Sequence, residues 1–184
     1  MKIYTVIGGV NGTGKSAFTG VLAKIDTELG IIVDADNLTA AENGDKMKGG
    51  KKAVHIIADC LEKGVNFTQE TTLSGKKTLR TVISAKEKDY FIRLYYIGIS
   101  SAEESISRIE NRVRKGGHSI APEDVKRRYE KRFEDLIKIL PYCNEVQFYD
   151  NENGFVYVGE YRNGRIYTAG DYIPDWLREL KNII

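Results

Sequence analysis

Apolar and polar positions alternate along this chain with two different periods, and the two periods follow one another in a regular order. Short β-branched and apolar runs predict strands at residues 2–7, 31–33, 65–70, 90–99 and 145–149. Apolar residues at helical spacing predict helices at residues 15–24, 53–63, 76–88, 102–115 and 122–140. Strands that alternate with helices indicate an α/β fold with a mostly parallel sheet and helices on both faces.

The rest of the chain gives weaker signals. Residues 31–33 are short and wholly apolar, which predicts a buried strand, whereas the Gly- and Lys-rich residues 43–52 predict a mobile segment. Near the end, residues 155–158 and 165–168 flank Asn163-Gly164 and predict a hairpin with a type I′ turn, followed by a short helix. We find no linker or repeat, so residues 1–184 are expected to form one domain, with 152–184 as a C-terminal hairpin and helix.

Residues 9–16, GVNGTGKS, match the pattern G-x-x-x-x-G-K-[S/T] and lie between a predicted strand and a predicted helix. Glycines let backbone N–H groups surround an anion, and the helix N-terminus adds partial positive charge. Lys15 is expected to reach the β- and γ-phosphates and Ser16 to bind Mg²⁺. The motif predicts a P-loop protein that binds ATP through Gly9, Asn11, Gly12, Thr13, Gly14, Lys15, Ser16 and Ala17. No N-K-x-D motif occurs, which disfavours a GTPase.

Two acidic residues follow the second predicted strand, in the run IIVDAD. In an extended chain Asp34 and Asp36 would project to the same side, at the strand end where α/β proteins bind ligands. Asp34 could then hold the water shell of Mg²⁺, and Asp36 could orient or deprotonate an acceptor hydroxyl. The alternative is that the two residues only form a turn and cap a helix.

The third predicted strand ends in Gln69-Glu70-Thr71-Thr72, which brings an acid and a hydroxyl to the same edge of the sheet. Glu70 and Thr72 suit the recognition of an acceptor that carries hydroxyl or amide groups. Thr72 could instead cap the next helix.

Residues 101–140 carry a cluster of basic side chains around the glycine-containing loop 115–122. Arg108 and Arg112 are four residues apart and share one helix face, while His118 lies in the loop and Arg128 beyond it. This pattern predicts a lid that brings cations onto the triphosphate, where they would stabilise the charge of a phosphoryl transition state. The alternative is a solvated helix whose arginines pair with neighbouring glutamates.

Composition narrows the possible partners. The net charge is +2 over 184 residues, so electrostatics does not require nucleic acid, and no apolar run reaches the roughly 20 residues of a membrane span. The two cysteines, Cys60 and Cys143, match no metal or redox spacing, which favours a reducing cytoplasm.

Five segments occur in order: GGVNGTGKS, VDADN, ETTLSG, RIENRVRKGGHSIAPEDVKRRY and FYDN. Together they resemble the zeta toxin family of P-loop kinases, especially its short stand-alone bacterial branch, over residues 2–151. The resemblance implies a three-layer αβα kinase fold and phosphorylation of a sugar such as that of UDP-N-acetylglucosamine. Its implied residues are Asp36 as general base, Glu70 and Thr72 for the sugar, Lys15 and Ser16 in the Walker motif, and Arg108 on the phosphates.

Two positions depart from that family's pattern. His118 lies where larger members place a second arginine, so His118, Arg112 and Arg128 are all candidates for that role. Ser74 stands where larger toxins carry an arginine for the substrate, which leaves the acceptor open. We therefore expect an ATP- and Mg²⁺-dependent kinase of a small hydroxyl-bearing molecule. The alternatives are a nucleotide-binding module or toxin controlled by an antitoxin, and a nucleic-acid end kinase.

Overall fold

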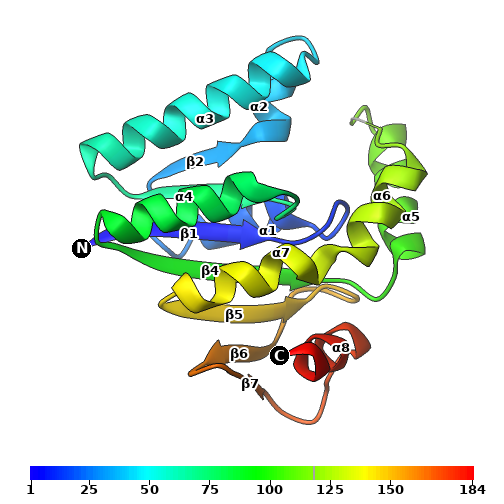
Figure 1. Cartoon of the computed structure of the whole chain (residues 1–184). Coiled ribbons are helices and arrows are strands. Elements are labelled where there is room, and N and C mark those ends of the chain that lie inside the picture. Colours follow the sequence, from blue (N-terminus) through cyan, green and yellow to red (C-terminus); the bar gives the residue numbers. More distant parts are fainter. Residues whose placement is uncertain (118) are drawn as a thin grey trace.

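The central element of the molecule is a twisted, mostly parallel sheet. The computed structural model describes residues 1–117 and 119–184, and within them the sheet has seven strands in the order β2-β3-β1-β4-β5-β6-β7 (Figure 1). The strands are β1 (Lys2–Gly8), β2 (Ile31–Asp34), β3 (Phe67–Thr71), β4 (Tyr90–Gly98), β5 (Glu145–Asp150), β6 (Val156–Arg162) and β7 (Arg165–Thr168). Strands β1 to β5 run parallel, and β6 and β7 complete the sheet in antiparallel fashion.

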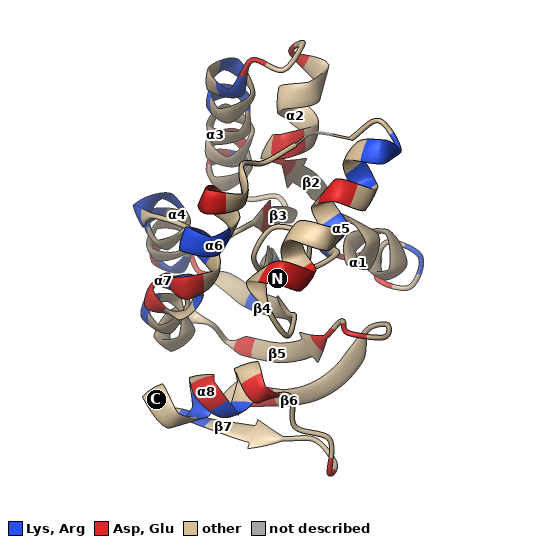
Figure 2. Cartoon of the chain, turned by 90° about the vertical axis from the view of Figure 1, so that its right-hand side faces the viewer, with Lys and Arg blue, Asp and Glu red and all other residues tan. Residues whose placement is uncertain are grey.

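Helices cover the two faces of this sheet unequally. They are α1 (Lys15–Leu22), α2 (Ala35–Ala41), α3 (Lys46–Lys63), α4 (Lys76–Glu87), α5 (Ala102–Arg114), α6 (Pro122–Glu130), α7 (Arg132–Ile139) and α8 (Asp175–Ile183), with a 3₁₀ turn at Leu140–Tyr142. Helices α3, α4, α7 and α8 lie on one face and α1 on the other, while α5 and α6 stand beyond the strand ends (Figures 1 and 2). The predicted three-layer α/β fold with a C-terminal hairpin and helix is confirmed.

Two hydrophobic clusters reflect this unequal cover. The smaller cluster lies under α1 and consists of Ile7, Phe18, Leu22, Leu29, Tyr95 and Ile97. The larger one fills the face covered by α3, α4, α7 and α8. Central strand β1 is buried on both faces, whereas β5 alternates between buried and half-buried positions.

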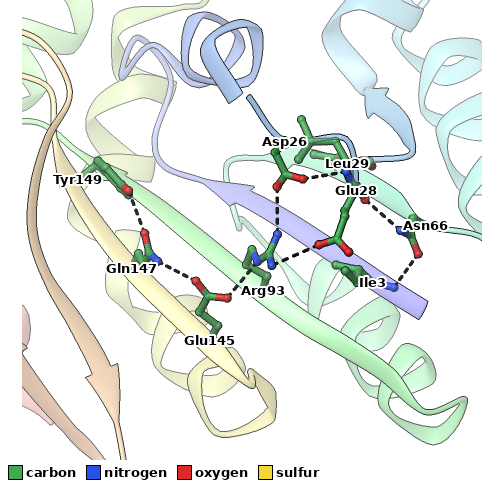
Figure 3. Close-up of polar contacts among 10 residues, drawn as sticks. Ile3, Asp26, Glu28, Leu29, Asn66, Arg93, Glu145, Gln147 and Tyr149 are labelled. Atoms are coloured by element: carbon green, nitrogen blue, oxygen red, sulfur yellow. Dashed lines mark hydrogen bonds and ion pairs between the residues drawn. The ribbon is translucent and has the colours of Figure 1, made fainter. Parts of the chain in front are cut away.

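A polar network closes the part of the α1 face that no helix covers (Figure 3). The guanidinium of Arg93, on β4, contacts Asp26 at 3.1 Å, Glu145 at 3.0 Å and Glu28 at 3.9 Å. Asn66 donates to the carbonyl of Glu28 and accepts from the N–H of Ile3. The network thus ties the loop after α1 to the sheet, and this loop leads directly into β2 and its acidic end.

The prediction of a mobile segment at residues 43–52 is wrong. Helix α2 ends at Ala41 and α3 already begins at Lys46, where the Asp45 carboxylate accepts from the N–H groups of Met47 and Lys48. Gly49 packs so closely on α2 that a Cβ there would lie 2.3 Å from the Thr39 hydroxyl oxygen. The glycine that suggested mobility is therefore a contact between two helices.

Two further elements differ from the sequence-based expectation. The strand at residues 31–33 is an edge strand with Ile31 and Ile32 exposed, and only Val33 is buried. The helix expected at 122–140 divides at Lys131 into α6 and α7. The division lets α7 pack Phe133, Leu136 and Ile139 into the core while α6 stands over the strand ends.

The C-terminal hairpin has the predicted turn. Asn163 and Gly164 both have positive φ, 53° and 78°, as a type I′ turn requires. The hairpin extends the sheet beyond β5, and α8 returns to pack Trp176, Leu177 and Leu180 into the larger core. Among the described helices, none is long and apolar enough to cross a membrane.

Candidate active site

The loop between β1 and α1 forms the base of a cleft at the carboxyl ends of the parallel strands. Gly12 and Gly14 adopt positive φ, 81° and 88°, and Gly14 occupies the N-cap position of α1 without any side-chain cap. The first N–H groups of α1 are therefore available to an anion, and the helix dipole adds to their attraction. This is the geometry that the GVNGTGKS motif predicts.

Lys15 lies at the base of this loop. Its Nζ donates to the carbonyl oxygens of Gly9 at 2.9 Å and Val10 at 3.0 Å. Burial lowers the pKa of Lys15, and the nearby carboxylates of Glu70, Asp36 and Asp34 oppose that shift. A cation surrounded by acids and held by weak neutral acceptors can exchange those carbonyl oxygens for phosphate oxygens.

The nucleotide-binding residues expected from the motif divide into two groups. Asn11, Gly12, Gly14, Lys15, Ser16 and Ala17 line the cleft. Gly9 and Thr13 do not, because Gly9 supplies a carbonyl to Lys15 and the buried Thr13 hydroxyl donates to the carbonyl of Val10 at 3.0 Å. These two residues shape the loop from behind.

Glu70, at the end of β3, is directed at helix α1. Its side chain is 9% exposed, and its two oxygens accept from the hydroxyls of Ser16 at 2.7 Å and Thr19 at 2.6 Å. Burial raises the pKa of Glu70, while the two hydroxyl donors act in the opposite direction. The sequence suggested a substrate contact for Glu70, whereas the structure places its carboxylate on the Walker serine.

The expected strand geometry of Asp34 and Asp36 is wrong, although both residues reach the cleft. Strand β2 ends at Asp34, whose carboxylate caps α2 by accepting from the N–H groups of Asp36 and Asn37. Asp36 lies in the first turn of α2 and not in an extended chain. The capping alternative therefore holds for Asp34, which also lies 3.5 Å from the Ser16 hydroxyl.

The acceptor side of the cleft is formed by the β3–α4 turn. Thr72 does not cap α4, because Gly75 occupies the N-cap position. The Thr72 hydroxyl instead donates to the Ser74 hydroxyl at 3.1 Å. Between them Leu73 has a positive φ of 59° and buries its side chain against Gly8. A non-glycine residue in this region is strained, and the packing of Leu73 holds the two hydroxyls at the cleft.

Three arginines form the opposite wall. Arg108 donates to Glu104 at 2.6 Å and to the carbonyl of Glu152 at 3.1 Å, and Arg128 donates to the Asn11 side chain at 2.7 Å. Arg112 also lines the cleft. Arg114 and Arg127 bond to Asn111 and Asp124 and do not line it. His118, a candidate for the lid, lies outside the described residues.

The cleft as a whole has a volume of about 480 Å³. Figure 2 views this end of the sheet, with acidic residues near β2 and at the start of α2, and both basic and acidic residues on α5 and α6. Sequence reasoning missed Gln69, Lys77 and Thr78, which also line the cleft. Lys77 follows Gly75 by half a turn of α4, and only the helix start in the structure reveals its position.

The residues present suit magnesium better than a tightly ligated metal. Among the described residues, no group of three or more His, Cys, Asp or Glu side chains could hold a metal ion. Mg²⁺ keeps several waters and takes only one or two protein ligands beside phosphate oxygens. The Ser16 hydroxyl, with Glu70 bonded to it and Asp34 close by, fits that requirement.

Comparison with solved structures places this architecture in a known class. A chain of the PezAT chromosomal toxin–antitoxin system of Streptococcus pneumoniae matches with a TM-score of 0.67 and 20% identity, over 98% of this chain and 77% of that one. AvrRxo1-ORF1:ORF2 with ATP matches with a TM-score of 0.69 and 15% identity, over 98% of this chain and 63% of that one. A putative kinase of Chloroflexus aurantiacus matches at 0.53 and 18% identity, over 68% and 75% of the two chains. This chain therefore has the same fold as these three proteins.

Sequence comparison adds a nearer relative. An uncharacterized protein of Haemophilus influenzae strain Rd is 32% identical over 126 residues, which are 66% of this chain and 88% of that protein. The chain belongs to the same family as this protein. No family model matches the chain.

Proposed function

We propose that this protein is a kinase that transfers the γ-phosphate of ATP to a hydroxyl group of a small molecule. The observation that carries the proposal is the composition of a single cleft, where the phosphate loop with Lys15, the carboxylate of Asp36 and three lid arginines meet. The nucleotide would lie with its phosphates on the loop, and the acceptor would lie between Asp36 and the β3–α4 turn.

The proposed reaction is an in-line displacement at phosphorus. Asp36 accepts the proton of the acceptor hydroxyl while the oxygen of that hydroxyl bonds to the γ-phosphorus. At the same time the bond between the γ-phosphorus and the β,γ-bridging oxygen breaks, and ADP is released. Lys15, Arg108 and a second lid arginine stabilise the charge on the transferred group. Among described residues the Asp36 carboxylate makes no hydrogen bond of its own, so it is available to an acceptor.

Magnesium would be held by Ser16, with Asp34 acting through water, and would neutralise charge on the β- and γ-phosphates. Glu70 would accept the Ser16 hydroxyl proton and thereby direct a lone pair of that oxygen toward the ion. This places Glu70 in the nucleotide half of the cleft, and Thr72 remains the proposed acceptor contact.

A sugar or nucleotide sugar such as UDP-N-acetylglucosamine is our first candidate for the acceptor. Its support is the resemblance of the sequence motifs to zeta toxins and a cleft wall of hydroxyl and amide groups from Gln69, Thr72 and Ser74. The test incubates the protein with ATP, Mg²⁺ and pools of sugars and nucleotide sugars, followed by mass spectrometry for products heavier by one phosphoryl group.

The decisive variant is Asp36→Asn, which keeps the size of the side chain and removes the base. Product formation should decrease by about 10²- to 10⁴-fold with ATP affinity unchanged. Asp59→Asn, on the surface of α3 and away from the cleft, is the matched control and should have full activity. Equal rates for Asp36→Asn and the wild-type protein would remove Asp36 from the mechanism.

A protein partner that controls the kinase is a second proposal, supported by the PezAT toxin–antitoxin neighbour. Edge strand β7 is a candidate docking site, since within the described sheet it pairs only with β6. Co-expression with the product of the adjacent reading frame tests it. A stable complex with reduced kinase activity supports control by an antitoxin, and unchanged activity with no complex argues against it.

A further inference from the structure

The C-terminal helix is connected to the phosphate loop through three consecutive residues at the end of β5. Asp150 is 2% exposed, and its carboxylate accepts from the indole N–H of Trp176 at 2.7 Å and the hydroxyl of Tyr172 at 3.1 Å. A buried carboxylate requires such donors, because an unpaired charge is costly in the interior. Asp150 therefore anchors the segment that ends in α8.

The next two residues, Asn151 and Glu152, contact the phosphate loop and Arg108. Asn151 donates from its side-chain amide to the carbonyl of Thr13, inside the phosphate loop, at 2.8 Å. The carbonyl of Glu152 accepts from Arg108 at 3.1 Å, and the N–H of Glu152 returns to the Asp150 carboxylate at 3.1 Å. The turn at residues 151–152 therefore bonds both to the phosphate loop and to Arg108. The same turn is also bonded to the Asp150 carboxylate.

The indole of Trp176 makes a second contact in the same region. It lies on Gly98, the last residue of β4, where an added Cβ would lie 2.1 Å from Trp176 Cε2. The carbonyl of Gly98 accepts from the N–H of Asn151 at 3.1 Å, and the carbonyl of the preceding Ile97 packs against Gly9. Trp176 therefore supports the back of the phosphate loop through both β4 and β5.

We propose that Asp150 is a positioning residue for nucleotide binding, and that the Asp150–Trp176 hydrogen bond couples the C-terminal helix to the phosphate loop. The proposal rests on the proposed ATP binding, but it concerns residues that do not line the cleft. Coupling of this kind is reciprocal, so that nucleotide must also affect the environment of Trp176.

The test uses the full chain and measures ATP affinity by calorimetry at a temperature where circular dichroism shows every variant to be folded. Trp176→Phe keeps most of the packing and removes the donor, and Asp150→Asn places an amide N–H against one of the existing donors. Each should raise the ATP dissociation constant by about three- to tenfold. Tyr172→Phe, at a half-exposed ring, should have a smaller effect in the same direction.

Leu180→Ala is the matched control, because Leu180 is buried on the same helix and makes none of the hydrogen bonds to Asp150. It should lower thermal stability and leave ATP affinity unchanged. The chain has one tryptophan, so emission from Trp176 in the wild-type protein should change on ATP addition and should not change in Asn151→Ala.

The outcomes separate the two proposals. Wild-type protein that does not bind ATP overturns the proposed function and this inference with it. Wild-type protein that binds ATP, with Trp176→Phe and Asp150→Asn binding equally well, overturns this inference alone. A weaker affinity in Leu180→Ala of the same size as in Trp176→Phe also contradicts it, because general loosening of α8 would then suffice.

Discussion

The two halves of the cleft are built in different ways. In the nucleotide half, Lys15 bonds to a carbonyl of the phosphate loop, and Glu70 at the end of β3 accepts from Ser16 and Thr19 on α1. In the acceptor half, Asp36 and Lys77 reach the cleft with no side-chain hydrogen bond among the described residues. The nucleotide half is thus preorganised by the central strands. In the acceptor half only the side chains of the β3–α4 turn and Gln69 are held, and Asp36 and Lys77 are left to be engaged by a ligand.

This difference matches what the proposed kinase reaction requires of each half. P-loop kinases share a nucleoside triphosphate donor, and a rigid cradle such as that at β1 and β3 of this chain suits a donor that does not vary. Acceptors differ between enzymes, and in this chain the proposed acceptor contacts come from α2 and the β3–α4 turn, which lie outside the central strands. Substitutions in the first half should therefore affect nucleotide binding, and those in the second should affect the acceptor alone.

The largest effect is expected for Lys15→Ala. Loss of the cation at the base of the loop should reduce phosphoryl transfer by at least about 10²-fold, because the charge on the transferred group is no longer stabilised. Calorimetry should also show weaker ATP binding, with the fold intact by circular dichroism. Retention of full ATP affinity would contradict the division between the two halves.

Glu70→Gln should separate activity from stability. Since burial raises the Glu70 pKa above its ordinary 4.5, the folded protein retains a proton there that the unfolded chain releases. The free energy of unfolding therefore falls as the pH rises from 4.5 through the folded pKa. Glu70→Gln removes the charge, so the free energy of unfolding should no longer fall over this pH range, and the variant should be at least as stable as the wild-type protein at pH 8.

Activity should respond in the opposite direction, because the ionised Glu70 accepts from both the Ser16 and the Thr19 hydroxyls, whereas the protonated acid keeps one acceptor oxygen and carries a donor on the other. Kinase activity should rise with pH through the same range in the wild-type protein, and Glu70→Gln should lose about tenfold or more in kcat with a higher Mg²⁺ requirement. Chemical denaturation without Mg²⁺ and Mg²⁺ titrations of activity provide the two measurements. A variant that is less stable at pH 8 and normal in Mg²⁺ dependence would refute the assignment.

Arg128→Ala tests the contact between the lid and the loop. The Arg128 guanidinium holds Asn11 at 2.7 Å, so its removal should weaken ATP binding by about three- to tenfold and leave the acceptor KM unchanged. Arg127→Ala on the same helix is the matched control, because Arg127 pairs with Asp124 and does not line the cleft. If both substitutions weakened ATP binding equally, the cause would be the loss of positive charge from α6 and not the loss of the Arg128–Asn11 contact.

Lys77→Met should produce the smallest change in kinetics, and it tests the acceptor half alone. Lys77 is exposed in the first turn of α4, so ATP affinity and thermal stability should not change. The KM for an acceptor that carries an anionic group should rise by about two- to fivefold, and the KM for a neutral sugar should stay constant. Steady-state kinetics with both kinds of acceptor decide between these outcomes.

The strongest local patterns were sufficient to predict much of the fold and the backbone geometry of the phosphate loop. The GVNGTGKS motif predicts strand, loop and helix together, because each of its residue types is required by the geometry of an anion-binding loop. The Asn163-Gly164 turn is equally local, since both residues tolerate the positive φ that the hairpin needs. These predictions succeeded because each depends only on neighbours in the chain.

Other predictions failed where contacts between distant segments decide the conformation. Gly49 contributed to the prediction of a mobile segment, whereas in the structure it packs against Thr39. Residues 31–33 were predicted to be buried, whereas their strand lies at the sheet edge. In the sequence Glu70 is an acidic residue at the end of a strand, but its contacts depend on the hydroxyls of Ser16 and Thr19, which lie beside it on α1. No pattern within these segments carries that information.

The sequence by itself determined that this protein has a phosphate loop between a strand and a helix, in an alternating α/β chain. Only the tertiary structure decided which acid meets Ser16, which arginines face the cleft and how Trp176 and Asp150 reach the loop. The physical reason is the separation along the chain over which each interaction acts. Backbone conformation and the helix dipole act over a few residues of the chain, whereas charge pairing and close packing act between any residues that the fold brings together.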